Sequence, residues 1–201
     1  MRRRAVVGRM TAAFLAAIVT VGVVTLVAGA HDTDFMDPND RAGKLDVRIV
    51  KLKHAPSPAI WTVVTFGDWG IREIWDRGYV TVMLDTRDGP PADHYLLVRS
   101  TGNELRGSLW RIRAVGPDIF QGAVQVHRRS RRSVSVQVSL WRLAFGESRR
   151  FYRWSVHTIF TSDACRRTCQ DHAPNGGVSV KQWRPGMSPS PSPSASPSPP
   201  G

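Results

Sequence analysis

The chain has 201 residues, with 28 lysines and arginines against 16 acidic residues and a formal net charge of +12. This length suits one folded domain with a single core. The sequence contains no HExxH, G-x-S-x-G or phosphate-loop motif, which excludes the hydrolases and nucleotide-binding proteins that those motifs define. The excess of basic residues favours anionic partners such as wall polymers, lipid headgroups or extracellular DNA; arginines on ordinary solvated faces are the alternative.

Residues 1–30 have the pattern of an export segment. Four arginines in the first nine residues precede an uncharged, apolar run. A basic start, an apolar run and the small residues Ala28 and Ala30 are typical of a secretory signal peptide, so we expect cleavage after Ala30. The run is also close to the roughly 20 residues that span a bilayer, so an uncleaved signal anchor is the alternative. In both cases we expect the domain that follows to be secreted or held at the cell surface.

The export segment is followed by a cluster of aspartates. Five of the sixteen acidic residues fall between His31 and Asp46. Calcium prefers six to eight hard oxygen ligands, often from Asp and Asn side chains in a turn. We therefore identify Asp37, Asn39, Asp40 and Asp46 as a candidate Ca²⁺ site. The pattern is not an EF-hand loop, and a solvated linker whose aspartates cap local N–H groups is the alternative.

From residue 45 onward, apolar residues alternate with polar ones at the period of a β-strand. The clearest run is 133–140, in which every second residue is apolar. We expect eight or nine short strands in an antiparallel, jelly-roll-like β-sandwich over residues 31–186. The predicted strands cover residues 45–52, 60–66, 79–84, 94–99, 104–112, 122–127, 133–140 and 151–160.

Seven tryptophans are many for one domain. Trp61, Trp110 and Trp154 lie in predicted strands, and we expect them in the core. Trp69 and Trp75 lie in a loop that contains Gly and Asp. Because sugar rings stack on exposed aromatic side chains, Trp69 and Trp75 form a candidate carbohydrate platform; core packing is the alternative.

Two further motifs follow in chain order. The hairpin His127–Arg132 carries four arginines, which are candidates for binding an anionic polymer, with a solvated hairpin tip as the alternative. These residues are Arg128, Arg129, Arg131 and Arg132. Cys165 and Cys169 are the only cysteines. In an oxidising compartment we expect a structural disulfide, since a redox pair usually has the spacing C-x-x-C and a zinc site needs about four ligands.

The chain ends in a low-complexity segment, residues 187–201, in which Ser and Pro alternate. Such a segment cannot bury apolar surface, so we expect a disordered tail that serves as a stalk or spacer, or that simply frays.

The segment Asp37-Pro-Asn-Asp40 followed by Gly43-Lys-Leu-Asp-Val-Arg48, the alternating strands and the Cys165–Asp171 region together carry a resemblance. The chain resembles small exported actinobacterial β-sandwich proteins of uncharacterised function. In outline it is also similar to the calcium-associated β-sandwich modules of some secreted glycoside hydrolases. The resemblance implies a β-sandwich, stabilised by Ca²⁺ and without a catalytic centre.

These observations lead us to expect a non-enzymatic binding or structural module at the cell surface. The predicted partners are an anionic cell-wall polymer or a glycan, and the membrane if the export segment is not cleaved; we expect no specific nucleic acid. One alternative is carbohydrate recognition by exposed tryptophans. Another is a secreted hydrolase with a site that only the fold assembles, since catalytic triads are defined by geometry and not by spacing.

Overall fold

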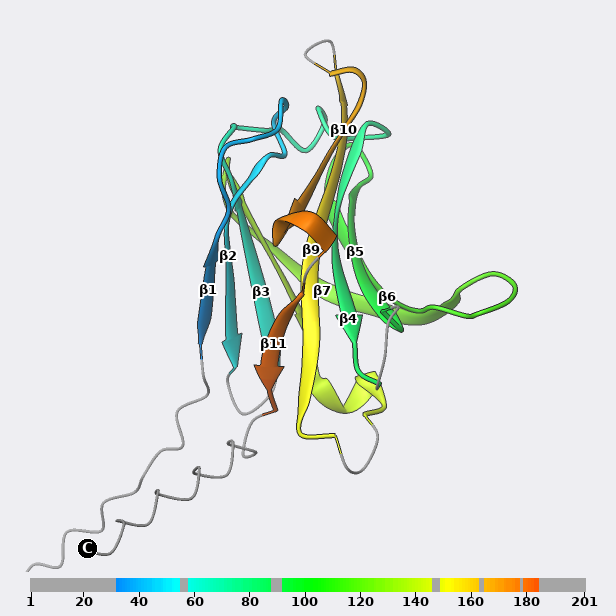
Figure 1. Ribbon diagram of the computed structural model, residues 1–201. Helices are drawn as coiled ribbons and strands as arrows, with labels where there is room; N and C mark the ends of the chain where they lie inside the picture. Colours follow the sequence, from blue (N-terminus) through cyan, green and yellow to red (C-terminus); the bar gives the residue numbers. More distant parts are fainter. Residues whose placement is uncertain are drawn as a thin grey trace, which may run out of the picture.

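The computed structural model describes residues 32–54, 58–87, 92–145, 149–162, 165–177 and 179–184 (Figure 1). The predicted export segment and the Ser/Pro tail lie outside these residues. The described part is all-β and antiparallel, which confirms the predicted fold class. None of its helical segments is long and apolar enough to cross a membrane.

Eleven strands and two short 3₁₀ turns make up the described part of the chain. They are β1 (Thr33–Met36), β2 (Val47–His54), β3 (Ala59–Thr65), β4 (Gly78–Asp85), β5 (His94–Ser100), β6 (Leu105–Arg111), β7 (Ile119–Ser130), β8 (Ser133–Val138), η1 (Leu140–Leu143), β9 (Phe151–Ser162), β10 (Cys165–Ala173), η2 (Asn175–Gly177) and β11 (Val180–Trp183). The eight predicted strands correspond to β2–β9. The sequence missed β1, β10 and β11, because β1 and β11 have only four residues each and β10 is mostly polar.

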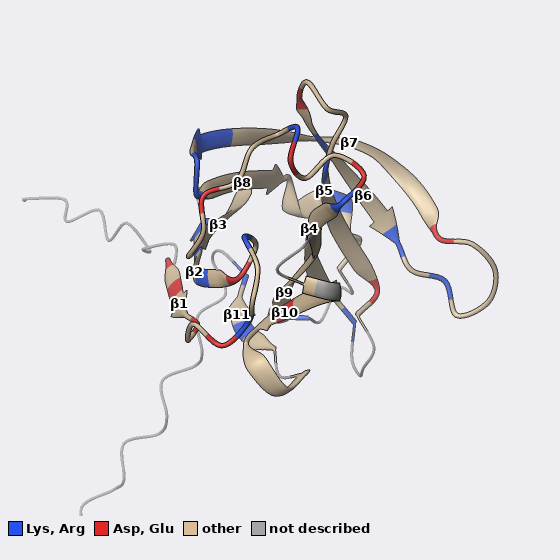
Figure 2. Cartoon of the chain, turned by 90° about the horizontal axis from the view of Figure 1, so that it is seen from above, with Lys and Arg blue, Asp and Glu red and all other residues tan. Residues whose placement is uncertain are grey.

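Neighbouring strands follow the order β1-β2-β3-β8-β7-β6-β5-β4-β9-β10, and β11 also pairs with β9. The long strand β7 joins the two layers of the sandwich. Its first half pairs with β6 and its second half with β8. Seen from above, the strands surround a common interior and form a nearly closed ring (Figure 2).

The core lies between the two layers and is formed by the inward positions of the alternating strands. In β3, buried and half-buried residues alternate without interruption. The rings of Trp61 and Trp154 are completely buried, as predicted. Tyr152 is also buried, and its ring meets Trp61 edge to face at a centroid distance of 6.3 Å. Its hydroxyl lies 2.5 Å from Nε2 of His54, so this buried polar group has a partner.

Side chains rather than a strand ladder close the ring between the β1–β2 layer and the β10–β11 edge. Oγ1 of Thr33 donates a hydrogen bond of 2.7 Å to Oε1 of Gln182. The backbone N–H of Val47 donates to Oδ2 of Asp171 at 2.6 Å. We call this boundary the seam. The hydrogen bond between Val47 and Asp171 holds the start of β2, and the segment before it, against β10.

Candidate functional site

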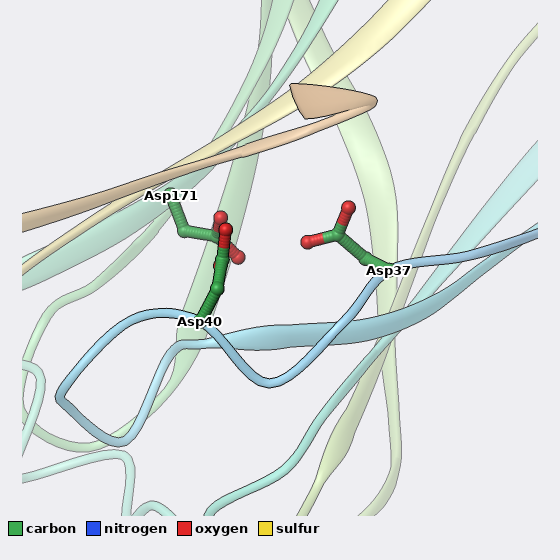
Figure 3. Close-up of side chains that lie close together, drawn as sticks. All are labelled: Asp37, Asp40 and Asp171. Carbon is green, nitrogen blue, oxygen red and sulfur yellow. The ribbon is translucent and has the colours of Figure 1, made fainter. Parts of the chain in front are cut away.

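Two aspartates of the loop after β1 meet a third aspartate, from β10, at the seam. Asp37 and Asp40 lie in the loop between β1 and β2, and Asp171 lies on β10. One carboxylate oxygen from each of these three residues lies within 4.8 Å of the other two, a separation at which they can hold a metal ion. Figure 3 shows the three carboxylates turned toward a common space between the loop and the strand.

Backbone contacts place these side chains. The N–H of Asp37 donates to the carbonyl of Arg48 at 2.9 Å, which extends the β1–β2 pairing by one residue. The N–H groups of Val47 and His172 donate to the two oxygens of Asp171, at 2.6 Å and 2.7 Å. The carboxylate of Asp171 is therefore held rigidly and presents its remaining lone pairs to the cluster.

Asn175 of η2 bridges the loop aspartates. Its Nδ2 lies 3.1 Å from Oδ2 of Asp40 and 3.4 Å from Oδ1 of Asp37. Among the described residues, the cation that pairs with the cluster is the guanidinium of Arg41, which lies 3.8 Å from Oδ1 of Asp40 and is half exposed. One amide and one solvated arginine offset only part of the negative charge of the cluster.

Asp46 adds a buried carboxylate beside the cluster. It is 3% exposed and forms no ion pair with any described residue, and only the backbone N–H and the charge of Arg41 favour its ionised form. Oδ2 of Asp37, which is 5% exposed, has no hydrogen-bond partner among the described residues. Buried carboxylates are normally paired, so these oxygens leave the site short of positive charge.

The pKa values of the site reflect this imbalance. Burial, followed by the charges of Asp171, Asp40 and Asp46, raises the pKa of Asp37 to about 7. Burial and the charges of Asp171 and Asp40 raise the pKa of Asp46 to about 6. Burial also raises the pKa of Asp171, although the N–H groups of Val47 and His172 oppose it. A bound cation would favour the ionised form of each carboxyl group.

The disulfide supports the loop that carries these aspartates. Cys165 and Cys169 are bonded, as predicted, with their Cα atoms 5.6 Å apart. Gly43 packs against this bond: a Cβ there would lie 3.2 Å from Sγ of Cys165, and its φ of +122° favours glycine. Any side chain at residue 43 would therefore push the loop away from the disulfide.

The structure brings together two of the four predicted metal ligands and adds one that the sequence did not indicate. Asp37 and Asp40 converge with Asp171, and Asp46 lies buried next to them. Asn39 is exposed in the turn between Asp37 and Asp40. Asp171 was missed because β10 was not predicted as a strand, so nothing marked residue 171 as an inward position.

Two of the four arginines in the hairpin between β7 and β8 contact residues of a neighbouring loop. The guanidinium of Arg128 lies 4.1 Å from the centre of the Trp69 ring and donates to the carbonyl of Trp69. Arg132 pairs with Asp68. Arg129 and Arg131 are exposed and form no ion pair within the described part of the chain. Of the four predicted anion-binding residues, these two are therefore the ones that are both exposed and without an ion pair among the described residues.

The positions of two tryptophans differ from the predicted ones. Trp69 is only 2% exposed and lies beneath Arg128, so it does not form an exposed platform with Trp75. Trp75 itself is half exposed and lies over Gly102. Trp110 was expected in the core but lies half-buried on the outer face of its sheet. Its neighbours there are Tyr95, at a centroid distance of 6.1 Å, and Phe120, at 5.2 Å. Alternation identified Trp110 as a strand residue but not which face it occupies.

The geometry thus gives a carboxylate cluster at the seam, two free arginines at one hairpin tip and no exposed pair of tryptophans at residues 69 and 75. Comparison with known proteins adds no further constraint on these sites: no protein-family model matches the chain, and neither a curated protein nor a solved structure resembles it significantly.

Proposed function

We propose that this protein is a non-enzymatic β-sandwich module that works outside the cytoplasm, secreted or at the cell surface, and that Ca²⁺ stabilises it at the seam. The observation that carries the calcium part is the convergence of Asp37, Asp40 and Asp171 within 4.8 Å, next to the buried Asp46, which forms no ion pair with any described residue. The location is supported by the signal-like first thirty residues and by the Cys165–Cys169 disulfide.

Calcium suits this ligand set better than other common ions. The three clustered residues are all carboxylates, with no His or Cys among them, which disfavours Zn²⁺. Mg²⁺ demands a near-ideal octahedron and gives up its water reluctantly, whereas Ca²⁺ accepts irregular sets of six to eight oxygens. Asp40 is exposed, so water can complete the coordination from that side.

The position of the site suggests what the ion does. Asp37 and Asp40 belong to the loop after β1, and Asp171 belongs to β10, on the other side of the seam. A cation bound by all three would link these edges, which are otherwise joined by a few side-chain hydrogen bonds. Calcium would then stabilise the closed ring, a structural role that requires no catalysis.

Replacing Asp40 with Asn will weaken calcium binding about tenfold or more, because the cluster loses one of its three charged ligands. Asp34→Asn is the matched control: Asp34 lies on β1 close to the site in sequence, but it is exposed and pairs with Lys51 at 3.3 Å. Isothermal titration of chelator-treated protein with CaCl₂ and with MgCl₂ measures both effects. The absence of calcium binding in the unsubstituted protein, or equal weakening by the two variants, would contradict the proposal.

A second candidate function is binding of an anionic cell-wall polymer at the β7–β8 hairpin. It is favoured by Arg129 and Arg131, which are exposed and form no ion pair within the described ranges. Arginine side chains at such a tip suit phosphate groups because their planar donors bind two oxygens at once.

Replacing Arg129 and Arg131 with Ser will weaken salt-sensitive binding to teichoic acid or heparin and leave the melting temperature unchanged. Arg128→Ser will instead lower the stability by about 1 kcal/mol, because the buried Trp69 loses its covering cation and a hydrogen bond. Affinity chromatography over a salt gradient and thermal melts separate the two effects. Polymer binding that persists in the Arg129/Arg131 variant would eliminate this candidate.

A further inference from the structure

The hairpin between β6 and β7 projects from the body of the sandwich (Figure 1). It carries three of the seven large apolar residues that are exposed in the described part of the molecule: Val115 is 84% exposed, Phe120 56% and Ile119 43%. Exposed apolar residues are common singly, but a cluster at the end of a protruding element marks an interaction site. Residues 114–117 form the turn of the hairpin, so Val115 lies at the end of the hairpin that is farthest from the sandwich.

Arginines surround the base of this hairpin. A hollow of about 530 Å³ is lined by Arg87, Arg111 and Arg113 together with Ile112, Val115 and Ile119 among others. Arg87 lies 3.3 Å from Asp93, whereas the side chains of Arg111 and Arg113 form no ion pair with any described residue. Blue segments lie where β6 leads into the projecting loop (Figure 2).

The one acidic residue of the hairpin, Asp118, accepts hydrogen bonds from residues at the base of the hairpin. Oδ1 of Asp118 accepts a hydrogen bond of 3.3 Å from the backbone N–H of Arg113. Together with burial, the charge of Asp118 also raises the pKa of Tyr95, whose hydroxyl bonds to it. Asp118 is half-buried, so the accessible charge around the hairpin is positive.

Aromatic side chains continue the apolar surface onto the sheet. Tyr95, Trp110 and Phe120 form a row across β5, β6 and β7, with ring centroids 6.1 Å and 5.2 Å apart. The indole N–H of Trp110 is satisfied by Oγ of Ser108 at 2.8 Å. Tyr and Trp side chains with one polar end are enriched at the headgroup level of membranes.

We propose that the β6–β7 hairpin binds the surface of an anionic phospholipid bilayer. Val115, Ile119 and Phe120 would enter the boundary between headgroups and acyl chains, while Arg111 and Arg113 contact lipid phosphates. An aliphatic tip with arginines behind it complements a surface whose charge lies outside its apolar interior. A soluble polyanion would use the arginines but would leave the aliphatic tip in water.

The test uses the chain from His31 to Gly201, because every buried residue of the described part lies between Asp37 and Gln182. It is mixed, in EDTA, with vesicles of phosphatidylglycerol or of phosphatidylcholine and sedimented. We expect binding to the anionic vesicles that falls with added salt. Val115→Ser combined with Phe120→Ser will weaken it about tenfold or more, and Arg111→Gln with Arg113→Gln will weaken it similarly.

Matched controls lie elsewhere on the same chain. Met36→Ser with Trp141→Ser removes two strongly exposed apolar side chains outside the hairpin, and Arg72→Gln with Arg77→Gln removes two exposed arginines from the loop between β3 and β4. Both controls should bind the vesicles like the unsubstituted chain. Thermal melts check that all variants are folded.

Three results would overturn the proposal: no preference for anionic vesicles, equal loss in the control variants, or binding that depends on Arg111 and Arg113 but not on Val115 and Phe120. The last result would indicate a site for soluble polyanions. Because the measurement is made in EDTA, its outcome is independent of calcium, and failure of the calcium site would leave it unchanged.

Discussion

At pH 8, calcium at about a hundred times its dissociation constant will stabilise this protein by about 2.7 kcal/mol and raise its melting temperature by roughly 5–10 °C. At pH 5 the same concentration will raise it by only about 1 °C. The pKa of Asp37 is raised to about 7, so protons occupy this ligand at pH 5. Two pH units below the pKa of a ligand, the apparent affinity of a metal falls about 100-fold.

The metal-free protein should show the opposite trend with pH. Asp37 and Asp46 have folded-state pKa values of about 7 and about 6, above their ordinary value of 3.8. Their contribution to stability is therefore greatest below pH 3.8 and is lost as the pH rises through 6 and 7. Bound calcium should prevent this loss of stability at high pH, because it favours the ionised carboxylates.

Differential scanning calorimetry at pH 5, 6, 7 and 8, with EDTA or CaCl₂ at matched ionic strength, measures both trends. A calcium-induced shift of the same size at pH 5 and pH 8 would mean that the ion does not bind at Asp37. No shift at either pH would mean that calcium does not stabilise the fold.

Asp37→Asn will have effects of opposite sign on stability and on calcium binding. Without metal at pH 8, the variant should be more stable by at least about 2 kcal/mol, which is roughly 4–8 °C, because a buried and uncompensated charge is removed. The gain should shrink as the pH falls and vanish below about pH 4, where Asp37 is protonated in both the folded and the unfolded chain. The stabilisation by calcium should fall from about 2.7 kcal/mol to about 1.4 kcal/mol or less, since the loss of one charged ligand weakens binding about tenfold or more.

Thermal melts of Asp37→Asn with and without CaCl₂ decide between a metal site and a purely structural carboxylate. Asp34→Asn again serves as the control, because it removes an exposed aspartate that pairs with Lys51. If Asp37→Asn is destabilising in EDTA at pH 8, the carboxylate of Asp37 contributes favourably to the metal-free fold. The charge imbalance on which the calcium proposal depends would then be absent.

The sequence alone determined the fold class and most of the strands. In β8, apolar residues recur at every second position, and this period follows from the pleat of a strand, whose successive side chains point to opposite faces. The disulfide followed equally directly, because the chain contains only one cysteine pair. Local chemistry was sufficient for these features since each depends on residues close together in the chain.

The tertiary structure decided which face each side chain occupies. Trp69 and Trp110 exchange their expected places: the loop tryptophan is buried beneath Arg128, and the strand tryptophan lies on the outer face with Tyr95. A shift of one residue in a strand moves a side chain from one face to the other, and a loop residue has no period at all. Neither outcome could be deduced from spacing.

The candidate metal centre shows the same division. The sequence identified Asp37, Asp40 and Asp46 because they are dense in one short segment, but Asp171 stands more than a hundred residues away on a strand with no alternating pattern. Only the closing of the sheet at the seam brings it within 4.8 Å of Asp37 and Asp40. Burial is also the largest cause of the raised pKa values of Asp37 and Asp171, ahead of the charges of the other aspartates.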